Sequence, residues 1–205
     1  MTLDELGQKH GTDKASGGHN YLVEYEPLLE QYRAKPELLV LEIGVREGAS
    51  VRLWHDYFPA AKIVGVDILE QCSAHAADRI DIEIGDQSDG GFLRHLTERY
   101  EPDIIFDDGS HFWTHQIDTF RILFPAMKQG GIFVCEDIHT SRSKWVGKYG
   151  APYTVSAAAY FGALAAQFAA EGHVYGTMPD SEFREITKLI EWMRFGRSFV
   201  AIKKV

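Results

Sequence analysis

The sequence predicts an α/β protein built on an open, mostly parallel sheet with an antiparallel strand near one edge. Two observations support this prediction: short apolar runs alternate with helical patterns along the chain, and the C-terminal region has the pattern of a hairpin. The 205 residues fit one domain with a sizeable core, because single domains commonly reach about 200 residues. We therefore expect a single domain that spans residues 1–205.

Five apolar runs are predicted to be parallel strands. Each run is nearly continuous in apolar residues, as expected of strands that are covered on both faces. In sheets of this kind, ligands bind at the carboxyl ends of the strands. The five predicted strands are Leu38–Ile43, Lys62–Asp67, Ile80–Ile84, Asp103–Asp107 and Gly131–Glu136.

Helices are predicted where apolar residues recur at i, i+3 and i+4. A longer helix is expected to start near Pro152. At the C-terminus, LIEWMRF and SFVAIKKV flank Gly196 and Arg197, which predicts a hairpin with a tight turn. The predicted helices are Tyr21–Tyr32, Ala49–Tyr57, Gly91–Tyr100, Thr114–Met127 and Ala151–Glu171.

Composition and charge narrow the functional classes. The formal net charge of −9 argues against a nucleic-acid partner, which would need a basic face. The N-terminus has no apolar signal region, and the longest apolar stretch, Ala157–Ala170, is too short to span a bilayer. Neither Cys72 nor Cys135 has a nearby cysteine of the kind that forms disulfide frameworks or zinc sites, so both are interpreted as core residues of a reducing compartment. We expect a cytoplasmic protein without a membrane partner.

A strand, a glycine-bearing turn and a helix follow one another in LLVLEIGVREGAS. Gly44 and Gly48 allow the backbone to approach a ligand closely, and the helix N-terminus offers free N–H groups. Arg46 and Glu47 stand where a dinucleotide site would have small residues, which weakens an NAD prediction. Glu42 favours a cationic ligand, because a carboxylate attracts an ammonium or sulfonium group.

The next two strand ends suit a nucleoside. Asp67 can accept hydrogen bonds from both hydroxyls of a ribose. The third strand ends in Gly85-Asp86-Gln87-Ser88, whose polar groups suit an adenine edge. A nucleoside joined to a cation describes S-adenosylmethionine, although solvated acids at strand ends remain the alternative.

Two acidic pairs end the fourth and fifth predicted strands: Asp107 with Asp108, and Glu136 with Asp137. If the strands are neighbours, both pairs lie at one edge of the sheet. Successive side chains of a strand point to opposite faces, so one member of each pair is expected to face the ligand. Carboxylates without cysteine favour Mg²⁺, with Mn²⁺ or Ca²⁺ as alternatives.

Three histidines lie near these acids. His111 follows Asp108 across a Gly-Ser turn and is the preferred general base, because the ordinary pKa of histidine is close to neutrality. His115 and His139 are interpreted as structural. A zinc site at His111 and His115 is an alternative, but the H-E-x-x-H pattern is absent.

Across almost its whole length, the chain resembles the metal-dependent sugar O-methyltransferases of the macrocin and mycinamicin type, which are related to the cephalosporin hydroxylase-like group. The C-terminal IEWMRFGRSFVAIKK also resembles the closing hairpin of this family. The other matching segments are GTDK at Gly11–Lys14 with His19 and Tyr21, EIGVREGAS at Glu42–Ser50, VGVDI at Val64–Ile68, GDQSD at Gly85–Asp89, DDGSH at Asp107–His111 and EDIHTS at Glu136–Ser141.

The resemblance implies a Rossmann-like class I methyltransferase fold, with a seven-stranded, mostly parallel sheet, helices on both faces and an antiparallel C-terminal strand. It implies S-adenosylmethionine and Mg²⁺ (or Mn²⁺) as cofactors and His111 as the base. Separately, the segment Thr12–Tyr21 is glycine-rich and polar, so residues 1–20 are expected to form a lid over the cofactor. The implied metal ligands are Asp108, Glu136 and Asp137. The expected cofactor contacts are Thr12, Tyr21, Glu42, Gly44, Gly48, Ser50, Asp67, Asp86, Gln87 and Asp107.

The expected activity is methyl transfer to a hydroxyl of a sugar in a natural product, an oligosaccharide or a polysaccharide. A catechol-type O-methyltransferase is one alternative, and a hydroxylase-like or non-catalytic cofactor-binding protein is another. The resemblance leaves a homo-oligomer possible. Four aromatic residues are candidates either for stacking on a sugar or for ordinary packing: Trp113, Trp145, Tyr149 and Tyr153.

Overall fold

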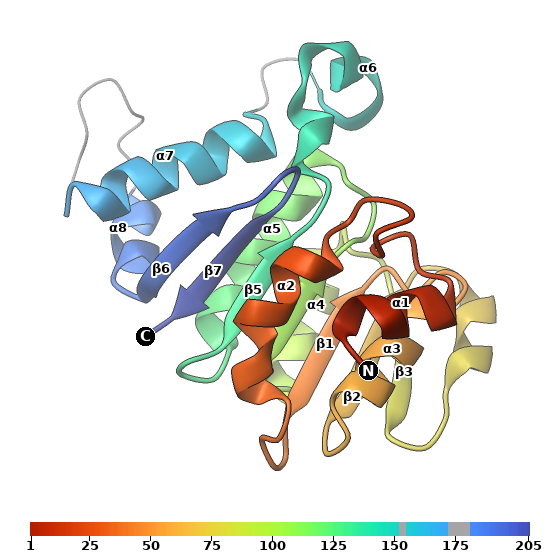
Figure 1. Ribbon diagram of the computed structural model, residues 1–205. Coiled ribbons are helices and arrows are strands. Elements are labelled where there is room, and N and C mark those ends of the chain that lie inside the picture. Colours follow the sequence, from red (N-terminus) through yellow and green to blue (C-terminus); the bar gives the residue numbers. More distant parts are fainter. Residues whose placement is uncertain (152–154, 172–180) are drawn as a thin grey trace. The chain divides into compact units, whose positions relative to one another are not determined.

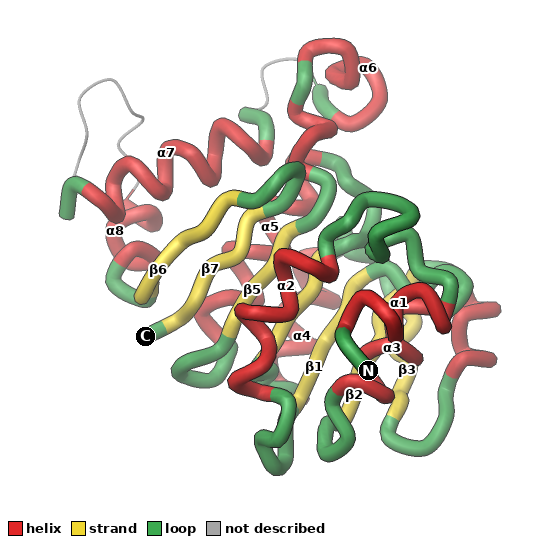
Figure 2. The backbone as a smooth tube through the Cα atoms, viewed as in Figure 1, coloured by secondary structure: helices red, strands yellow, loops and turns green. Residues whose placement is uncertain are grey.

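A computed structural model of the chain describes residues 1–151, 155–171 and 181–205. Its strands form a seven-stranded sheet in the order β3-β2-β1-β4-β5-β7-β6, flanked by helices (Figures 1 and 2). The predicted fold class is therefore confirmed. By its internal contacts the chain divides into two compact units, Met1–Asp86 and Gln87–Val205.

The first unit contains three parallel strands with β2 in the middle. The buried β1 and β2 supply its apolar centre, and α3 packs against β2. Helix α1 packs against both α2 and α3. The elements are α1 (Leu3–His10), α2 (Leu22–Leu29), η1 (Glu30–Tyr32), β1 (Leu39–Ile43), α3 (Ala49–Tyr57), β2 (Lys62–Asp67), η2 (Glu70–His75) and β3 (Ile80–Ile84).

Helix α1 is absent from the predicted elements, because its apolar pattern is short and residues 1–20 are interpreted as a lid. The structure shows what starts it: the Thr2 side chain accepts from the Glu5 amide, and the Glu5 side chain accepts from the Thr2 amide. This reciprocal capping satisfies two amides that the first helical turn leaves open. Leu3 and Leu6 are buried. A lid role for residues 1–20 stays a prediction.

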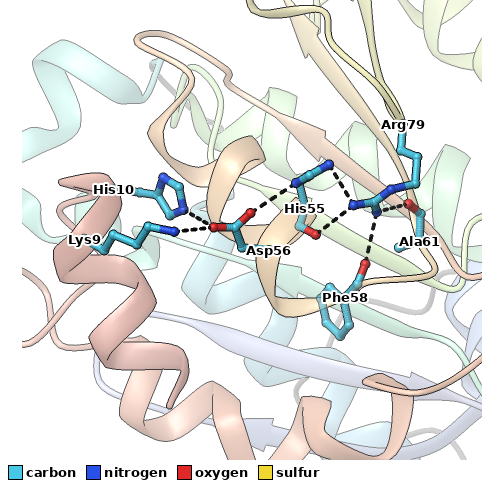
Figure 3. A network of polar contacts seen from close by, with 7 residues as sticks. All are labelled: Lys9, His10, His55, Asp56, Phe58, Ala61 and Arg79. Carbon is cyan, nitrogen blue, oxygen red and sulfur yellow. Dashed lines mark hydrogen bonds and ion pairs between the residues drawn. The ribbon is translucent and has the colours of Figure 1, made fainter. Parts of the chain in front are cut away.

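A polar network connects α1 to α3 through Asp56 (Figure 3). Asp56 Oδ2 lies 2.7 Å from Lys9 Nζ and 2.9 Å from His10 Nε2, while Asp56 Oδ1 lies 3.2 Å from His55 Nδ1. Arg79 Nη2 lies 2.7 Å from His55 Nε2 and extends the network toward β3. The hydrogen bond from Lys9 is the main cause that lowers the pKa of Asp56.

Replacing Asp56 with asparagine should lower the free energy of unfolding by about 1–2 kcal/mol at neutral pH, because hydrogen bonds to a charged group are lost. The pKa of Asp56 is lower in the folded chain than the ordinary 3.8, so its stabilising contribution is fully present above 3.8, is reduced below it, and is lost as the pH falls through the lowered pKa of the folded chain. Urea unfolding at pH 7 and pH 3 measures this. Asp81→Asn, in the exposed Lys62–Asp81 pair, is the control. An equal loss at both pH values would contradict the prediction.

The second unit pairs β4 with β5 in parallel, and β5 with β7 in antiparallel orientation. The predicted C-terminal hairpin is confirmed, since β6 and β7 are antiparallel neighbours. Helix α5 packs against α4, β5 and α7. The elements are α4 (Gly90–Arg99), β4 (Ile104–Asp107), α5 (Trp113–Leu123), η3 (Phe124–Ala126), β5 (Ile132–Cys135), η4 (Ile138–Ser141), η5 (Ser143–Trp145), α6 (Val146–Tyr149), α7 (Ala157–Ala169), α8 (Ser181–Thr187), β6 (Ile190–Phe195) and β7 (Val200–Lys204).

Helix boundaries account for most differences from the predicted elements. Helix α7 begins at Ala157 rather than near Pro152, because Ser156 caps it by accepting from the Ala159 amide. Pro152 itself lies outside the described residues. Helix α5 ends before Pro125, which has no N–H to continue the helical hydrogen bonds, and a short 3₁₀ turn follows. Neither α6 nor α8 was predicted.

Both cysteines lie in the interior, as expected of core residues. Cys72 and Cys135 are buried free thiols, and burial raises the pKa of both. Among the described residues, no helix combines the length and the apolar character that crossing a bilayer would need.

Candidate metal centre and glycine-bearing turn

The two acidic pairs of the second unit divide as strand alternation predicts. Asp107 and Glu136 are each only 1% exposed, whereas Asp108 and Asp137 are partly exposed. The Glu136 amide donates to the Asp107 carbonyl at 2.9 Å, which holds the two strand ends together. Asp137 then adopts a left-handed backbone conformation with φ 56° as the chain leaves β5. One acid of each pair is therefore available to a ligand.

Asp108, His111 and Asp137 form a group that could hold a metal ion, since one ligand atom from each lies within 4.8 Å of the others. His111 Nε2 is 3.6 Å from Asp137 Oδ2. The Nδ1 atom of His111 is buried and has no hydrogen-bond partner among the described residues. Two carboxylates and one imidazole form a donor set that suits a small divalent cation. The sequence analysis expected His111 as a base beside the metal, but the structure places it within the group.

Glu136, His115 and His139 are outside this group. The backbone carbonyl of Glu136 accepts from Gln116 Nε2 at 2.8 Å, and the role of Glu136 as a ligand stays a prediction. His115 Nδ1 lies 2.8 Å from Ser110 Oγ, which agrees with the structural role expected for it. His139 Nδ1 is 3.6 Å from Asp137 Oδ1. The group that could hold a metal does not include His115, so the zinc alternative gains no support from it.

Gln87 fixes the loop that carries Asp108 and His111. Its amide nitrogen donates to Asp107 Oδ1 at 2.7 Å and to Thr119 Oγ1 at 3.0 Å, and its amide oxygen accepts from the Ser110 N–H at 3.0 Å. Burial raises the pKa of Asp107 to about 7, while the hydrogen bond from Gln87 opposes that rise. No local sequence signal indicates this network, because Gln87 and Ser110 are brought together only by the tertiary fold. The expected adenine contact of Gln87 stays a prediction.

The glycine-bearing turn of the first unit has three residues with positive φ. Gly44 has φ 98° and Gly48 has φ 71°, and Arg46 adopts the same left-handed region with φ 51°. Asp67 Oδ2 supports the turn by accepting from the amides of Val45 and Arg46, each at 2.9 Å. Asp67 therefore holds the turn in position, and its expected contact with a ribose stays a prediction.

Arg46 stands where a dinucleotide site would have a small residue, but its side chain extends into solvent. Its side chain is 78% exposed and pairs with Glu47 at 3.3 Å. Its carbonyl is held by His75 Nε2 at 3.1 Å and by the Cys72 thiol at 3.4 Å. A side chain at Gly48 would collide with the His75 ring, with a Cβ only 2.7 Å from it, so this position requires glycine for space as well as for φ. The sequence analysis did not single out His75.

A buried ion pair lies at the end of β1. Lys14 Nζ is 3.9 Å from Glu42 Oε1, and the two side chains are 1% and 0% exposed. The expected cofactor contacts Thr12, Tyr21 and Ser50 are also buried, whereas Asp86 is exposed. Burying two charges is costly unless they compensate one another. The pair therefore joins the GTDK segment to β1, and cofactor binding by these residues stays a prediction.

A mostly parallel sheet, a glycine-bearing turn after β1 and acids at the strand ends define the Rossmann-like class of folds to which methyltransferases that use S-adenosylmethionine belong. No protein-family model matches the chain. Several curated proteins are similar to the chain in sequence. The demethylmacrocin O-methyltransferase of Streptomyces fradiae is 38% identical over 148 residues, which cover 68% of this chain and 37% of the relative. A tetracenomycin-C rhamnosyl 3'-O-methyltransferase of Streptomyces olivaceus is 39% identical over 147 residues, with the same two coverages.

A solved structure is similar over the whole chain. MycE methyltransferase from the mycinamycin biosynthetic pathway, in complex with Mg, SAH and mycinamycin VI, has a TM-score of 0.85 and 28% identity; the match covers 100% of this chain and 54% of that one. Homologues of the chain at 36–39% identity are thus macrocin, mycinamicin and tetracenomycin sugar O-methyltransferases. The chain spans little more than a third of the length of these curated relatives.

Proposed function

We propose that this chain is an O-methyltransferase that uses S-adenosylmethionine and Mg²⁺ to methylate a hydroxyl of a sugar in a natural product or an oligosaccharide. The observation that carries the proposal is the Asp108, His111 and Asp137 group, in a chain that matches along its full length a methyltransferase described with Mg and SAH. The fold places all three residues at or just beyond the ends of β4 and β5. In sheets of this class, that is the end at which ligands bind.

The donor set fits the proposed ion, since Asp108 and Asp137 supply hard carboxylate oxygens. When bound, Mg²⁺ lowers the pKa of a hydroxyl that it contacts and helps to orient it. His111 is proposed to remain unbound to the ion and to take the proton from the acceptor hydroxyl, and Asp137 keeps the imidazole beside the site through the 3.6 Å contact. Gln87 holds the Asp107–His111 loop in place for both roles.

The cofactor is proposed to bind at the glycine-bearing turn. Glu42, Gly44, Gly48 and Asp67 lie at the ends of β1 and β2, where a nucleoside and a sulfonium group would find close backbone and acidic partners. A catechol-type acceptor has weaker support. A Staphylococcus aureus structure described as a putative caffeoyl-CoA O-methyltransferase is only 13% identical to this chain, with a TM-score of 0.50, which indicates a shared fold alone.

The function is tested by incubating the purified chain with S-adenosylmethionine and a panel of glycosides, and by measuring S-adenosylhomocysteine release together with methylated sugar by mass spectrometry. We expect methyl transfer to at least one glycoside, loss of activity with EDTA and recovery with excess Mg²⁺. Activity that persists in EDTA would contradict the metal assignment. Methylation of catechols but not glycosides would contradict the acceptor class.

A further inference from the structure

A basic and aromatic segment follows the candidate metal centre. The stretch IHTSRSKWVGKYG, residues 138–150, contains Arg142, Lys144 and Lys148 and no acid, in a chain whose formal net charge is −9. The three basic side chains are exposed. The segment starts directly after Asp137, and its end returns to the same site, because the Tyr149 ring lies 6.2 Å from the His111 ring. It therefore borders the place proposed for the acceptor hydroxyl.

Aromatic rings near His111 form a connected group. Tyr149 contacts Phe112 at 6.1 Å and Trp145 at 5.9 Å between ring centroids, both edge to face. Phe112 is 42% exposed, and Trp145 and Tyr149 are partly exposed. Trp113, by contrast, is buried, and its ring occupies the space that a side chain at Gly150 would need, so it packs in the interior. Tyr153 lies outside the described residues.

The two lysines lie over these rings. Lys148 Nζ is 4.7 Å from the centroid of Tyr149, and Lys144 Nζ is 5.0 Å from the centroid of Trp145. Neither ammonium group has an acidic partner among the described residues. A cation over an aromatic face is held there by the ring electrons and keeps its charge. We name Phe112, Lys144, Trp145, Lys148 and Tyr149 the basic aromatic surface.

We propose that the basic aromatic surface selects an acceptor sugar that carries a negative charge, such as a carboxylate or a phosphate, beside the hydroxyl to be methylated. The inference rests on the proposed function. The overall negative charge of the chain would repel an anionic acceptor, and the lysines offset that repulsion at the site itself. The rings offer apolar faces to the sugar, and the ammonium groups pair with its anionic substituent.

Binding to matched probes tests this proposal in the presence of S-adenosylhomocysteine and Mg²⁺. The probes are p-nitrophenyl glucuronide, which carries a carboxylate, glucosyl phosphate, and the neutral p-nitrophenyl glucoside. We expect at least one anionic probe to bind more tightly than the glucoside. The double variant Lys144→Gln/Lys148→Gln should lower the affinity for that anionic probe about tenfold and leave the affinity for the glucoside nearly unchanged. The difference between wild type and variant should become smaller at high salt. The anionic probe that binds more tightly identifies the preferred charged group, a carboxylate or a phosphate.

The matched control is Lys35→Gln, because Lys35 also lies over an aromatic ring, 6.0 Å from the centroid of Tyr32, in the other unit. This variant should leave the affinity for all three probes unchanged. The proposal is overturned if the anionic probes fail to bind, bind no better than the glucoside, or are unaffected by the double variant. These outcomes differ from a failure of the proposed function, which would show as no methyl transfer to any glycoside.

Discussion

Replacing His111 with alanine is expected to slow methyl transfer by about 10²–10⁴-fold, the contribution typical of a positioned general base. The affinity for S-adenosylhomocysteine should change little, because His111 is not among the expected cofactor contacts, and Glu42, Gly44 and Gly48 belong to β1 and the turn after it. Single-turnover kinetics measure the chemical step, and calorimetry measures cofactor binding. His95→Ala, on an exposed part of α4, is the control.

A separate readout is needed because His111 also belongs to the group that could hold a metal. If His111 is chiefly a base, His111→Ala retains most of its affinity for Mn²⁺ and loses the chemical step. If His111 is chiefly a ligand, Mn²⁺ affinity falls together with the rate, and excess metal restores part of the activity. An alanine variant that is as fast as the wild type would remove His111 from both roles.

Replacing Lys14 with methionine is expected to lower the free energy of unfolding by about 3–5 kcal/mol, the usual cost of removing one partner of a buried ion pair. The physical reason is that the Glu42 carboxylate, 0% exposed, loses a cation that lies 3.9 Å away. Urea unfolding followed by circular dichroism measures the change. Lys62→Met removes a lysine from an exposed pair and should cost less than about 1 kcal/mol.

The double variant Lys14→Met/Glu42→Gln distinguishes the ion pair from simple packing. Removing both charges should recover a large part of the lost stability, since the carboxylate that needs the cation is then absent. A Lys14→Met variant as stable as the wild type would contradict the role of the pair. Additive losses in the double variant would mean that Lys14 and Glu42 stabilise the fold independently of one another.

The strands could be predicted from the sequence because each one has a local pattern of apolar residues. Strand β2 was predicted with its observed bounds, since a buried parallel strand is a continuous apolar run. Helix α1 was missed although its start carries a local signal, Thr2 followed by Glu5 at the spacing of a capping box. Leu3 and Leu6 are its two leucines, and so its apolar pattern is too short to stand out.

The candidate site could be predicted only in part. Strand alternation indicates that one acid of each pair faces a ligand, and the structure identifies Asp108 and Asp137 as the partly exposed members. Sequence reasoning could not place His111 relative to Asp137, because that contact depends on two loops that leave different strands in left-handed conformations. The same holds for Gln87, whose three hydrogen-bonded contacts come from separate elements.

The most direct test of the account is a titration of the chain with Mn²⁺, followed by electron paramagnetic resonance, with Mg²⁺ as competitor. The account predicts one bound ion per chain, displaced by Mg²⁺, and much weaker binding in Asp108→Asn and in Asp137→Asn, while Asp81→Asn on the exposed part of β3 binds normally. Equal Mn²⁺ affinity in the wild type and in both site variants would contradict it.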